Sequence, residues 1–198
     1  GRMQGVLYVF TPTITDVNGY WYRGTADAIY QNLDFLRKCH EPYVIITSGD
    51  AVYKMDYNKV LEYHIAKKAD ITVVCKELAP DEDATRFGTV KMNESCRIEE
   101  FEEKPVVARS QTVSTVKKIY GYKMGTYWSN ISTVDAYYKT NMDFVKPEVR
   151  KYFFKELPAV YSKVSDQPPA KYNPGAVVKN SLVGSGSIIN GTVENSVI

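Results

Sequence analysis

The chain has 198 residues, 44% of them hydrophobic, which suits one medium-sized domain or a domain with the start of a second. Its formal net charge is +2, and lysine and arginine are spread along the chain, which argues against a nucleic-acid-binding surface. The sequence has no apolar run of about 18 residues that would predict a membrane span, and its first residues lack the pattern of a secretory signal. The widely spaced Cys39, Cys75 and Cys96 fit neither a disulfide framework nor a zinc site. We therefore expect a cytoplasmic protein.

The first part of the chain alternates between strand and helix patterns. Residues 5–10 and 43–47 are apolar runs without alternation, as in strands buried on both faces of a parallel sheet. Between them, Thr25 is suited to cap a helix that runs to about Lys38. A second helix is predicted from apolar residues at positions 57, 61 and 65, followed by a buried strand at 71–75. Strand, helix and strand in this order form a βαβ unit, which predicts an α/β fold.

The middle of the chain predicts three more strands. Residues 88–92 and 97–102 have strand composition and are joined by the turn residues Asn93, Glu94 and Ser95. Residues 119–123 form another apolar, strand-like run.

Two amphipathic helices are then expected. In the first, Ser132 and Asp135 have the spacing of a capping box, and the predicted apolar face carries Val134, Tyr138 and Met142. The second is predicted over residues 147–161. Its apolar positions are Val149, Phe153, Phe154 and Leu157.

The composition changes after Pro168 and Pro169. Aliphatic pairs recur at 177/178, 182/183, 188/189 and 197/198, with Val193 between, and small or turn residues fill the gaps. This five- to six-residue period is typical of hexapeptide β-helices. We therefore predict an α/β domain over residues 1–165 and the start of a β-helix domain, cut short, over residues 166–198.

Three short segments carry residues suited to phosphate chemistry. Asp50 directly follows an apolar run, and a carboxylate beyond the carboxyl end of a parallel strand can bridge Mg²⁺ to phosphate oxygens, although it can also simply cap the next segment. Gly24 lies where a loop meets a helix, so a nucleotide can approach the backbone there, but an ordinary capped helix has the same pattern. Lys104 follows a strand, either as a phosphate partner or as a solvated lysine.

Taken together and in this order, these segments resemble ADP-glucose pyrophosphorylase (glucose-1-phosphate adenylyltransferase). The resemblance extends over nearly all of the chain and includes W-Y-R-G-T-A-D-A-I-Y-Q-N, S-G-D-x-V-Y-K-M-D-Y, R-F-G-x-V, F-E-E-K-P, Y-W-S-N-I-S-T-V-D-A-Y-Y-K-T-N-M-D and the hexapeptide tail. It implies a Rossmann-like nucleotidyltransferase domain with a mostly parallel sheet, followed by a left-handed β-helix. It also implies tetramers that use Mg²⁺ to convert ATP and glucose 1-phosphate into ADP-glucose and pyrophosphate for glycogen or starch synthesis.

The resemblance also implies roles for individual residues. Asp50 would hold Mg²⁺, and the sugar phosphate would attack the α-phosphorus of ATP in line, with catalysis by positioning and charge neutralisation. Glu103 and Lys104 would hold the sugar phosphate. The adenine and ribose would be lined by Tyr22, Gly24, Thr25 and Ala26.

Three residues depart from the family pattern. Catalytic members have histidine where this chain has Ala51, and Y-W-x-D-V-G-T where this chain has Asn130 in place of the acid and Ser132 in place of the glycine. A neutral amide can offer an oxygen but cannot neutralise Mg²⁺, so we expect metal binding and catalysis to be weakened. The family's glycine-rich nucleotide loop and a middle segment near 115/116 are also missing from this sequence, and the simplest expectation is that it lacks stretches of a longer protein.

These departures favour the regulatory, largely inactive subunit of the bacterial two-subunit enzyme. Such a chain would keep part of the sugar-phosphate site, respond to ATP, ADP-glucose or a sugar-phosphate effector, and assemble with a catalytic subunit into a hetero-oligomer. The alternatives are an active nucleotidyltransferase making ADP-glucose or a related sugar nucleotide, a scaffold that binds no nucleotide, and a hexapeptide acyltransferase. The last needs a histidine in the β-helix, whereas His40 and His64 both precede the tail.

Overall fold

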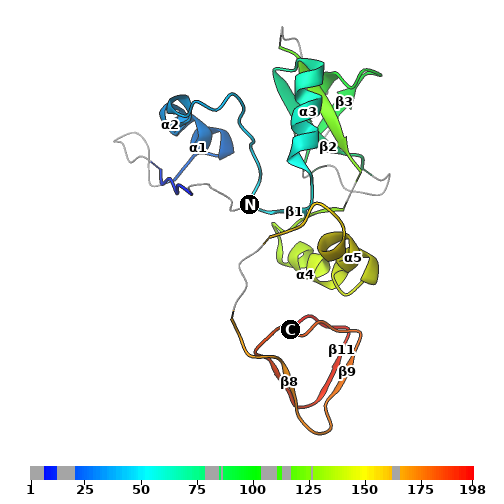
Figure 1. Cartoon of the computed structure of the whole chain (residues 1–198). Helices are drawn as coiled ribbons and strands as arrows, with labels where there is room; N and C mark the ends of the chain where they lie inside the picture. The colour runs from blue at the N-terminus through cyan, green and yellow to red at the C-terminus, as the bar shows by residue number, and fades with distance from the viewer. Residues whose placement is uncertain are drawn as a thin grey trace. The chain divides into compact units, whose positions relative to one another are not determined.

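Figure 1 shows the chain as a computed structural model, which describes residues 7–12, 21–78, 85, 87–103, 111–112, 117–125, 127–161 and 166–198. The chain divides into two compact units, residues 1–47 and 48–198. Within the described ranges, no helix is long and apolar enough to cross a membrane.

The first unit contains two short helices, α1 (Thr25–Gln31) and α2 (Leu33–Lys38), where one helix was predicted. The break falls at Asn32, whose side chain donates to the main-chain oxygen of Ala28 at 2.7 Å. The predicted cap at Thr25 is wrong: the N-cap residue is Gly24, at φ 145°, and Asp27 in the first turn accepts a hydrogen bond from the main-chain N–H of Arg23 at 2.9 Å. Glycine is favoured at this φ because it has no Cβ.

The two apolar runs of the first unit do not form the predicted strands. Residues 7–10 and 43–47 have no strand conformation, residues 5 and 6 lie outside the described part, and the side chains of Leu7 and Ile46 are 88% and 68% exposed. A strand needs a neighbour to pair its main-chain N–H and C=O groups, and none of the described residues of this unit provides one. The βαβ unit predicted over residues 43–75 is therefore wrong, and Asp50 does not follow a strand.

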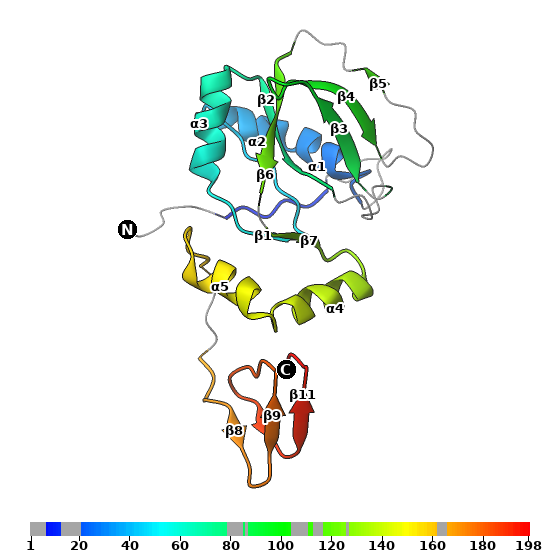
Figure 2. The ribbon, with the colours of Figure 1, turned by 90° about the vertical axis from the view of Figure 1, so that its right-hand side faces the viewer.

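The second unit contains a parallel strand pair, but between other segments than the predicted 43–47 and 71–75. Strand β2 (Ile71–Lys76) pairs in parallel with β6 (Ile119–Met124), and α3 (Tyr57–Lys67) lies against this pair in Figure 2. The Tyr63 hydroxyl of α3 donates to the main-chain oxygen of Gly121 at 3.0 Å. The Asp56 side chain caps α3 by accepting from the Asn58 N–H at 3.0 Å. The predicted helix and strands are confirmed as α3, β2 and β6, but their predicted burial is wrong. Tyr57 and Ile65 of the predicted apolar stripe are 39% and 51% exposed, and Ile71 and Val74 of β2 are 48% and 38% exposed.

Between β2 and β6, the chain forms an antiparallel sheet of three strands. It has the order β3 (Gly88–Met92), β4 (Ile98–Glu103) and β5 (Gln111–Thr112). The predicted turn between β3 and β4 is confirmed, because the Asn93 side chain accepts hydrogen bonds from the N–H groups of Ser95 and Arg97, each at 3.0 Å.

Strand β1 (Ala51–Tyr53) pairs antiparallel with β7 (Trp128–Asn130), and two helices follow, α4 (Val134–Asp143) and α5 (Pro147–Lys155). The predicted capping box at Ser132 is wrong, because the Thr133 side chain caps α4. The predicted apolar face of α4 is also wrong: Val134 and Tyr138 are 84% and 63% exposed, and Thr140 is the buried residue. Helix α5 is shorter than predicted, since Pro158 disfavours helical backbone in the residue before it.

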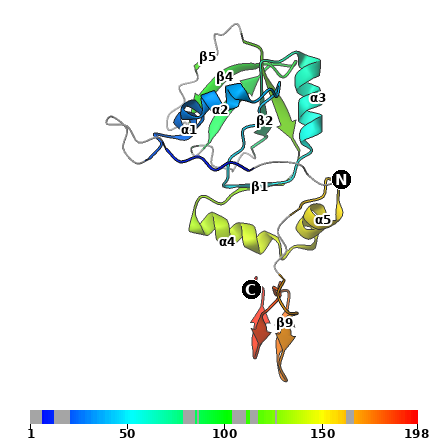
Figure 3. The same cartoon turned by 60° about the vertical axis from the view of Figure 1, so that its left-hand side comes forward.

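The tail forms successive turns of a coil that pair in parallel. Strand β8 (Lys171–Tyr172) pairs with β10 (Ile188–Ile189), and β9 (Val177–Lys179) pairs with β11 (Thr192–Glu194), as Figure 3 shows for β9. Like residues stack between turns: Asn180 donates to Asn195 at 2.6 Å, and Asn173 donates to Asn190 at 2.5 Å. A left-handed β-helix and a domain boundary near 165 stay predictions.

Candidate functional site

Asp50 and Asn130, 80 positions apart in the sequence, meet at one end of the β1–β7 ladder. Asn130 pairs with Ala51, and the main-chain N–H of Ile131 donates to the main-chain oxygen of Asp50 at 2.8 Å. The Asn130 side chain also hydrogen-bonds the Asp50 carboxylate. The structure therefore brings together two of the residues that the sequence singles out for metal chemistry.

The Asp50 carboxylate is stabilised in its ionised form. The Ser48 hydroxyl donates to its Oδ1 atom, and the Asn130 amide provides a second hydrogen bond. These two bonds lower the pKa of the Asp50 carboxyl below its ordinary value, because hydrogen bonds to a carboxylate favour the charged form. Asp50 is consequently negative at neutral pH.

The pair does not match the donor set that Mg²⁺ requires. A carboxylate only accepts hydrogen bonds, so Asn130 must present its amide nitrogen to Asp50. Its amide oxygen, which would be the metal ligand, accepts the main-chain N–H of Ser132 at 2.9 Å. Among the residues that the structure describes, no group of three or more His, Cys, Asp or Glu side chains could hold a metal ion. One carboxylate and one engaged amide leave the charge of a divalent cation largely unbalanced.

An aromatic side chain lies on the same face of β7 as Asn130, because side chains two positions apart point to the same side of a strand. This residue, Trp128, packs edge to face with Phe87, their ring centroids 5.2 Å apart. The Nζ atom of Lys76 is 5.8 Å from the centroid of the Trp128 ring. A ring beside an ammonium group suits a flat or apolar ligand that carries negative charge.

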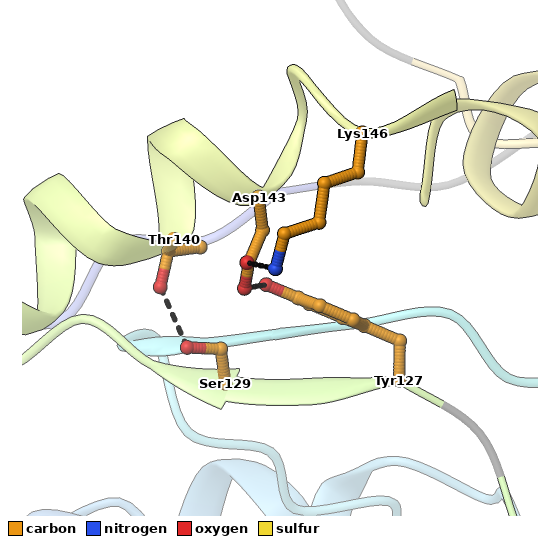
Figure 4. A network of polar contacts seen from close by, with 5 residues as sticks. All are labelled: Tyr127, Ser129, Thr140, Asp143 and Lys146. Atoms are coloured by element: carbon orange, nitrogen blue, oxygen red, sulfur yellow. Dashed lines mark hydrogen bonds and ion pairs between the residues drawn. The ribbon is translucent and has the colours of Figure 1, made fainter. Parts of the chain in front are cut away.

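The opposite face of β7 is attached to α4, as Figure 4 shows. The hydroxyls of Ser129 and Thr140 are 2.6 Å apart, and Tyr127 Oη donates to Asp143 at 2.9 Å. The Nζ atom of Lys146 pairs with the same carboxylate at 2.7 Å. Burial, followed by the Asp143 carboxylate, raises the pKa of Tyr127 to about 12. The sequence analysis did not predict a role for these residues. The available signal was the strand alternation in Y-W-S-N, which puts Tyr127 and Ser129 on the face opposite to Trp128 and Asn130.

The remaining predicted site residues belong to other elements or lie outside the described residues. Glu103 ends β4, in a different sheet from Asp50, and Lys104 lies outside the described residues. The predicted nucleotide residues belong to the first unit, where Asn32 donates to the Tyr22 hydroxyl at 3.3 Å. Of the other three, Gly24 precedes α1, and Thr25 and Ala26 begin it. Their roles stay predictions.

Comparison with known proteins shows the family. A family model for nucleotidyl transferases matches residues 6–166. The glucose-1-phosphate adenylyltransferases of Mycoplasma mobile, Geobacillus stearothermophilus and Bacillus subtilis are 32%, 33% and 33% identical to the whole chain, which covers 61%, 60% and 62% of them. Each alignment runs over 235 positions, so the relatives have segments without a counterpart among these 198 residues. Together with its α/β content and parallel strand pairs, this match shows that the chain, which spans about three fifths of these curated relatives, belongs to the nucleotidyl transferase family.

Proposed function

We propose that the chain is part of a regulatory subunit of a glucose-1-phosphate adenylyltransferase, the enzyme that forms ADP-glucose in glycogen synthesis. The similarity to enzymes of that name supports the reaction class. The observation that carries the regulatory role is Asn130, whose amide nitrogen faces Asp50 and whose oxygen is held by Ser132.

The reduced activity of this subunit follows from charge. Transfer of a nucleotidyl group builds negative charge on phosphate oxygens, and a divalent cation held by carboxylates is the usual means of neutralising it. Asp50 alone contributes one negative charge, whereas Asn130 contributes none. Mg²⁺ would thus be bound weakly, and the chain alone would turn over slowly or not at all.

The same arrangement is compatible with ligand binding. Trp128 lies on the same face of β7 as Asn130, and the Lys76 ammonium group of β2 is 5.8 Å from the centroid of its ring. Neither side chain needs a metal to contact a sugar nucleotide. We expect ADP-glucose or a sugar phosphate to bind as an effector, with Glu103 and Lys104 holding the sugar phosphate. The residues expected to line the adenine and ribose are Tyr22, Gly24, Thr25 and Ala26.

The partner is a catalytic pyrophosphorylase subunit, in a cytoplasmic hetero-oligomer of tetrameric size. Within residues 166–198, the pairs β8–β10 and β9–β11 are two-stranded, so each strand has an edge that can pair with another strand. We expect a left-handed β-helix built on these turns to take part in assembly.

A catalytically active sugar-phosphate nucleotidyltransferase is the second candidate. It is favoured by the ionised state of Asp50, since one carboxylate and the phosphates of the substrate can share a Mg²⁺ ion. ADP-glucose synthesis by the separate protein distinguishes the two candidates.

Ligand stabilisation tests the binding part of the proposal. The melting temperature of the full-length protein is measured with ADP-glucose, UDP-glucose and dTDP-glucose, each with Mg²⁺ and with a chelator. We expect ADP-glucose to raise the melting temperature most, and to do so without Mg²⁺. An absence of stabilisation by all three would contradict the proposal and favour a scaffold.

A further inference from the structure

Lys54 is a buried lysine that directly follows β1 and reaches the C-terminal end of α5. Its side chain is 5% exposed. Its Nζ atom donates to the main-chain oxygens of Tyr152 and of Glu156, the latter at 2.7 Å, and lies 4.6 Å from the centroid of the Tyr152 ring. The last carbonyls of a helix carry partial negative charge, so they are suitable partners for a buried ammonium group.

The contact is reciprocal. The Tyr152 hydroxyl donates to the main-chain oxygen of Lys54 at 2.7 Å, so side chains from both segments bind the main chain of the other. Among the described residues no carboxylate pairs with Lys54, and the carbonyls of α5 are its hydrogen-bond acceptors. These bonds therefore fix the end of β1 to α5 rather than forming part of a surface ion pair.

The partner strand is fixed to the same pair of helices. Ser129 of β7 and Tyr127, which directly precedes β7, bind Thr140 and Asp143 of α4. Arg150 of α5 donates to the main-chain oxygens of Phe144 and Val145, which directly follow α4, at 3.0 and 2.5 Å. Figure 2 shows α4 and α5 on one side of the β1–β7 ladder. Both strands are thus anchored on the helices, and their ends bring Asp50 and Asn130 together.

We propose that Lys54 is a positioning residue that holds β1 on α5 and thereby keeps Asp50 against Asn130. Its effect on ligand binding rests on the proposed function, whereas its effect on the geometry of the ladder does not. Helix α5 precedes the coil in the chain. A displacement of α5 would move Lys54, and with it β1 and Asp50.

Hydrogen exchange measures this positioning directly. The Ile131 N–H closes the site end of the ladder by donating to Asp50, and the Gly121 N–H, which donates to the oxygen of Cys96 at 2.8 Å, reports on another sheet. In full-length protein carrying Lys54→Met, we expect exchange at Ile131 to rise about tenfold and exchange at Gly121 to change less than about twofold, because local opening is independent of global unfolding. Lys59→Met, at an exposed position of α3, is the matched control and should change neither.

A second variant keeps the proposal testable should Lys54→Met fail to fold. Tyr152→Phe keeps the ring and removes the hydroxyl that binds Lys54, and Tyr138→Phe, at an exposed tyrosine of α4, is its control. We expect a smaller rise at Ile131 in Tyr152→Phe, again with Gly121 unchanged. Equal acceleration at Ile131 and Gly121, or unchanged exchange at Ile131, would overturn the proposal.

A binding measurement separates this proposal from the proposed function. Calorimetric titration with ADP-glucose should show affinity reduced several-fold in Lys54→Met and unchanged in Lys59→Met. If the unaltered protein does not bind ADP-glucose, the proposed function fails, and the exchange ratio of Ile131 to Gly121 still decides the role of Lys54.

Discussion

Replacing Asn130 with aspartate tests the electrostatic account of the site. In Asn130→Asp, the amide that donates to Asp50 becomes a second carboxylate beside the first. At about 4 Å, two unit charges repel by roughly 1 kcal/mol in water and roughly 4 kcal/mol at an effective dielectric constant of 20. Because Asp50 lies near the surface, we expect the lower part of this range, about 1–2 kcal/mol of lost stability.

The assay is thermal unfolding with a chelator and with Mg²⁺. A loss of this size lowers the melting temperature by roughly 2–8 °C for a domain of about 200 residues. Mg²⁺ should restore the melting temperature of Asn130→Asp, since a cation between two carboxylates removes their repulsion, and should have little effect on the unaltered protein.

The matched control is Asn58→Asp, which adds the same charge at an exposed position in the first turn of α3. It should show no response to Mg²⁺. The account is refuted if the unaltered protein is stabilised by Mg²⁺ as strongly as Asn130→Asp, because its site would then already hold the metal.

Three further changes test the contacts around the site. The pKa of Tyr127 is raised from 10.0 to about 12 in the folded protein, so the hydroxyl ionises at lower pH in the unfolded state and the free energy of unfolding should decrease between about pH 10 and pH 12. Urea titrations at pH 9 and pH 11 should show a smaller decrease for Tyr127→Phe than for the unaltered protein. Ser48→Ala removes the hydrogen bond that contributes most to the lowered pKa of Asp50, so a carbon-detected NMR titration should show this pKa moving up towards its ordinary value. An unchanged pKa would show that the Ser48–Asp50 hydrogen bond does not form in solution. Thr140→Val leaves the Ser129 hydroxyl without its partner and should lower the free energy of unfolding by about 1–2 kcal/mol in urea, whereas an unchanged midpoint would show that this contact contributes nothing.

Elements with a strong local signal were predictable from the sequence. Helix α3 has both a side-chain cap and an apolar stripe, β2 is rich in β-branched residues, and the β3–β4 hairpin has a turn residue, Asn93, that satisfies two main-chain N–H groups. In each case the information lies within a dozen residues, so no distant contact was needed.

Elements that depend on distant contacts were not predictable. The run at 43–47 has strand composition, yet composition does not supply the neighbouring strand that its main chain would need. In α4 the aromatic residues suggested the wrong face, because the decisive contact is a buried hydroxyl, that of Thr140, with Ser129 of β7.

The candidate site shows the same division. Asp50 was selected from local pattern and Asn130 from the family resemblance, and the structure adds that they are hydrogen-bonded. Lys54 was not selected, because an isolated lysine after a strand is ordinarily solvated. It is buried because it contacts α5 at Tyr152, 98 residues further along the chain. Contacts of such long range have no signature in a single sequence.

The most direct test of the regulatory role is ADP-glucose synthesis by the full-length protein. ATP, glucose 1-phosphate and Mg²⁺ are supplied to the protein alone, and then to its mixture with the catalytic subunit. We predict little or no turnover alone and an altered rate or effector response in the mixture. Strong Mg²⁺-dependent turnover by the protein alone would contradict the account, because it would mean that Asp50 suffices without a second carboxylate at position 130.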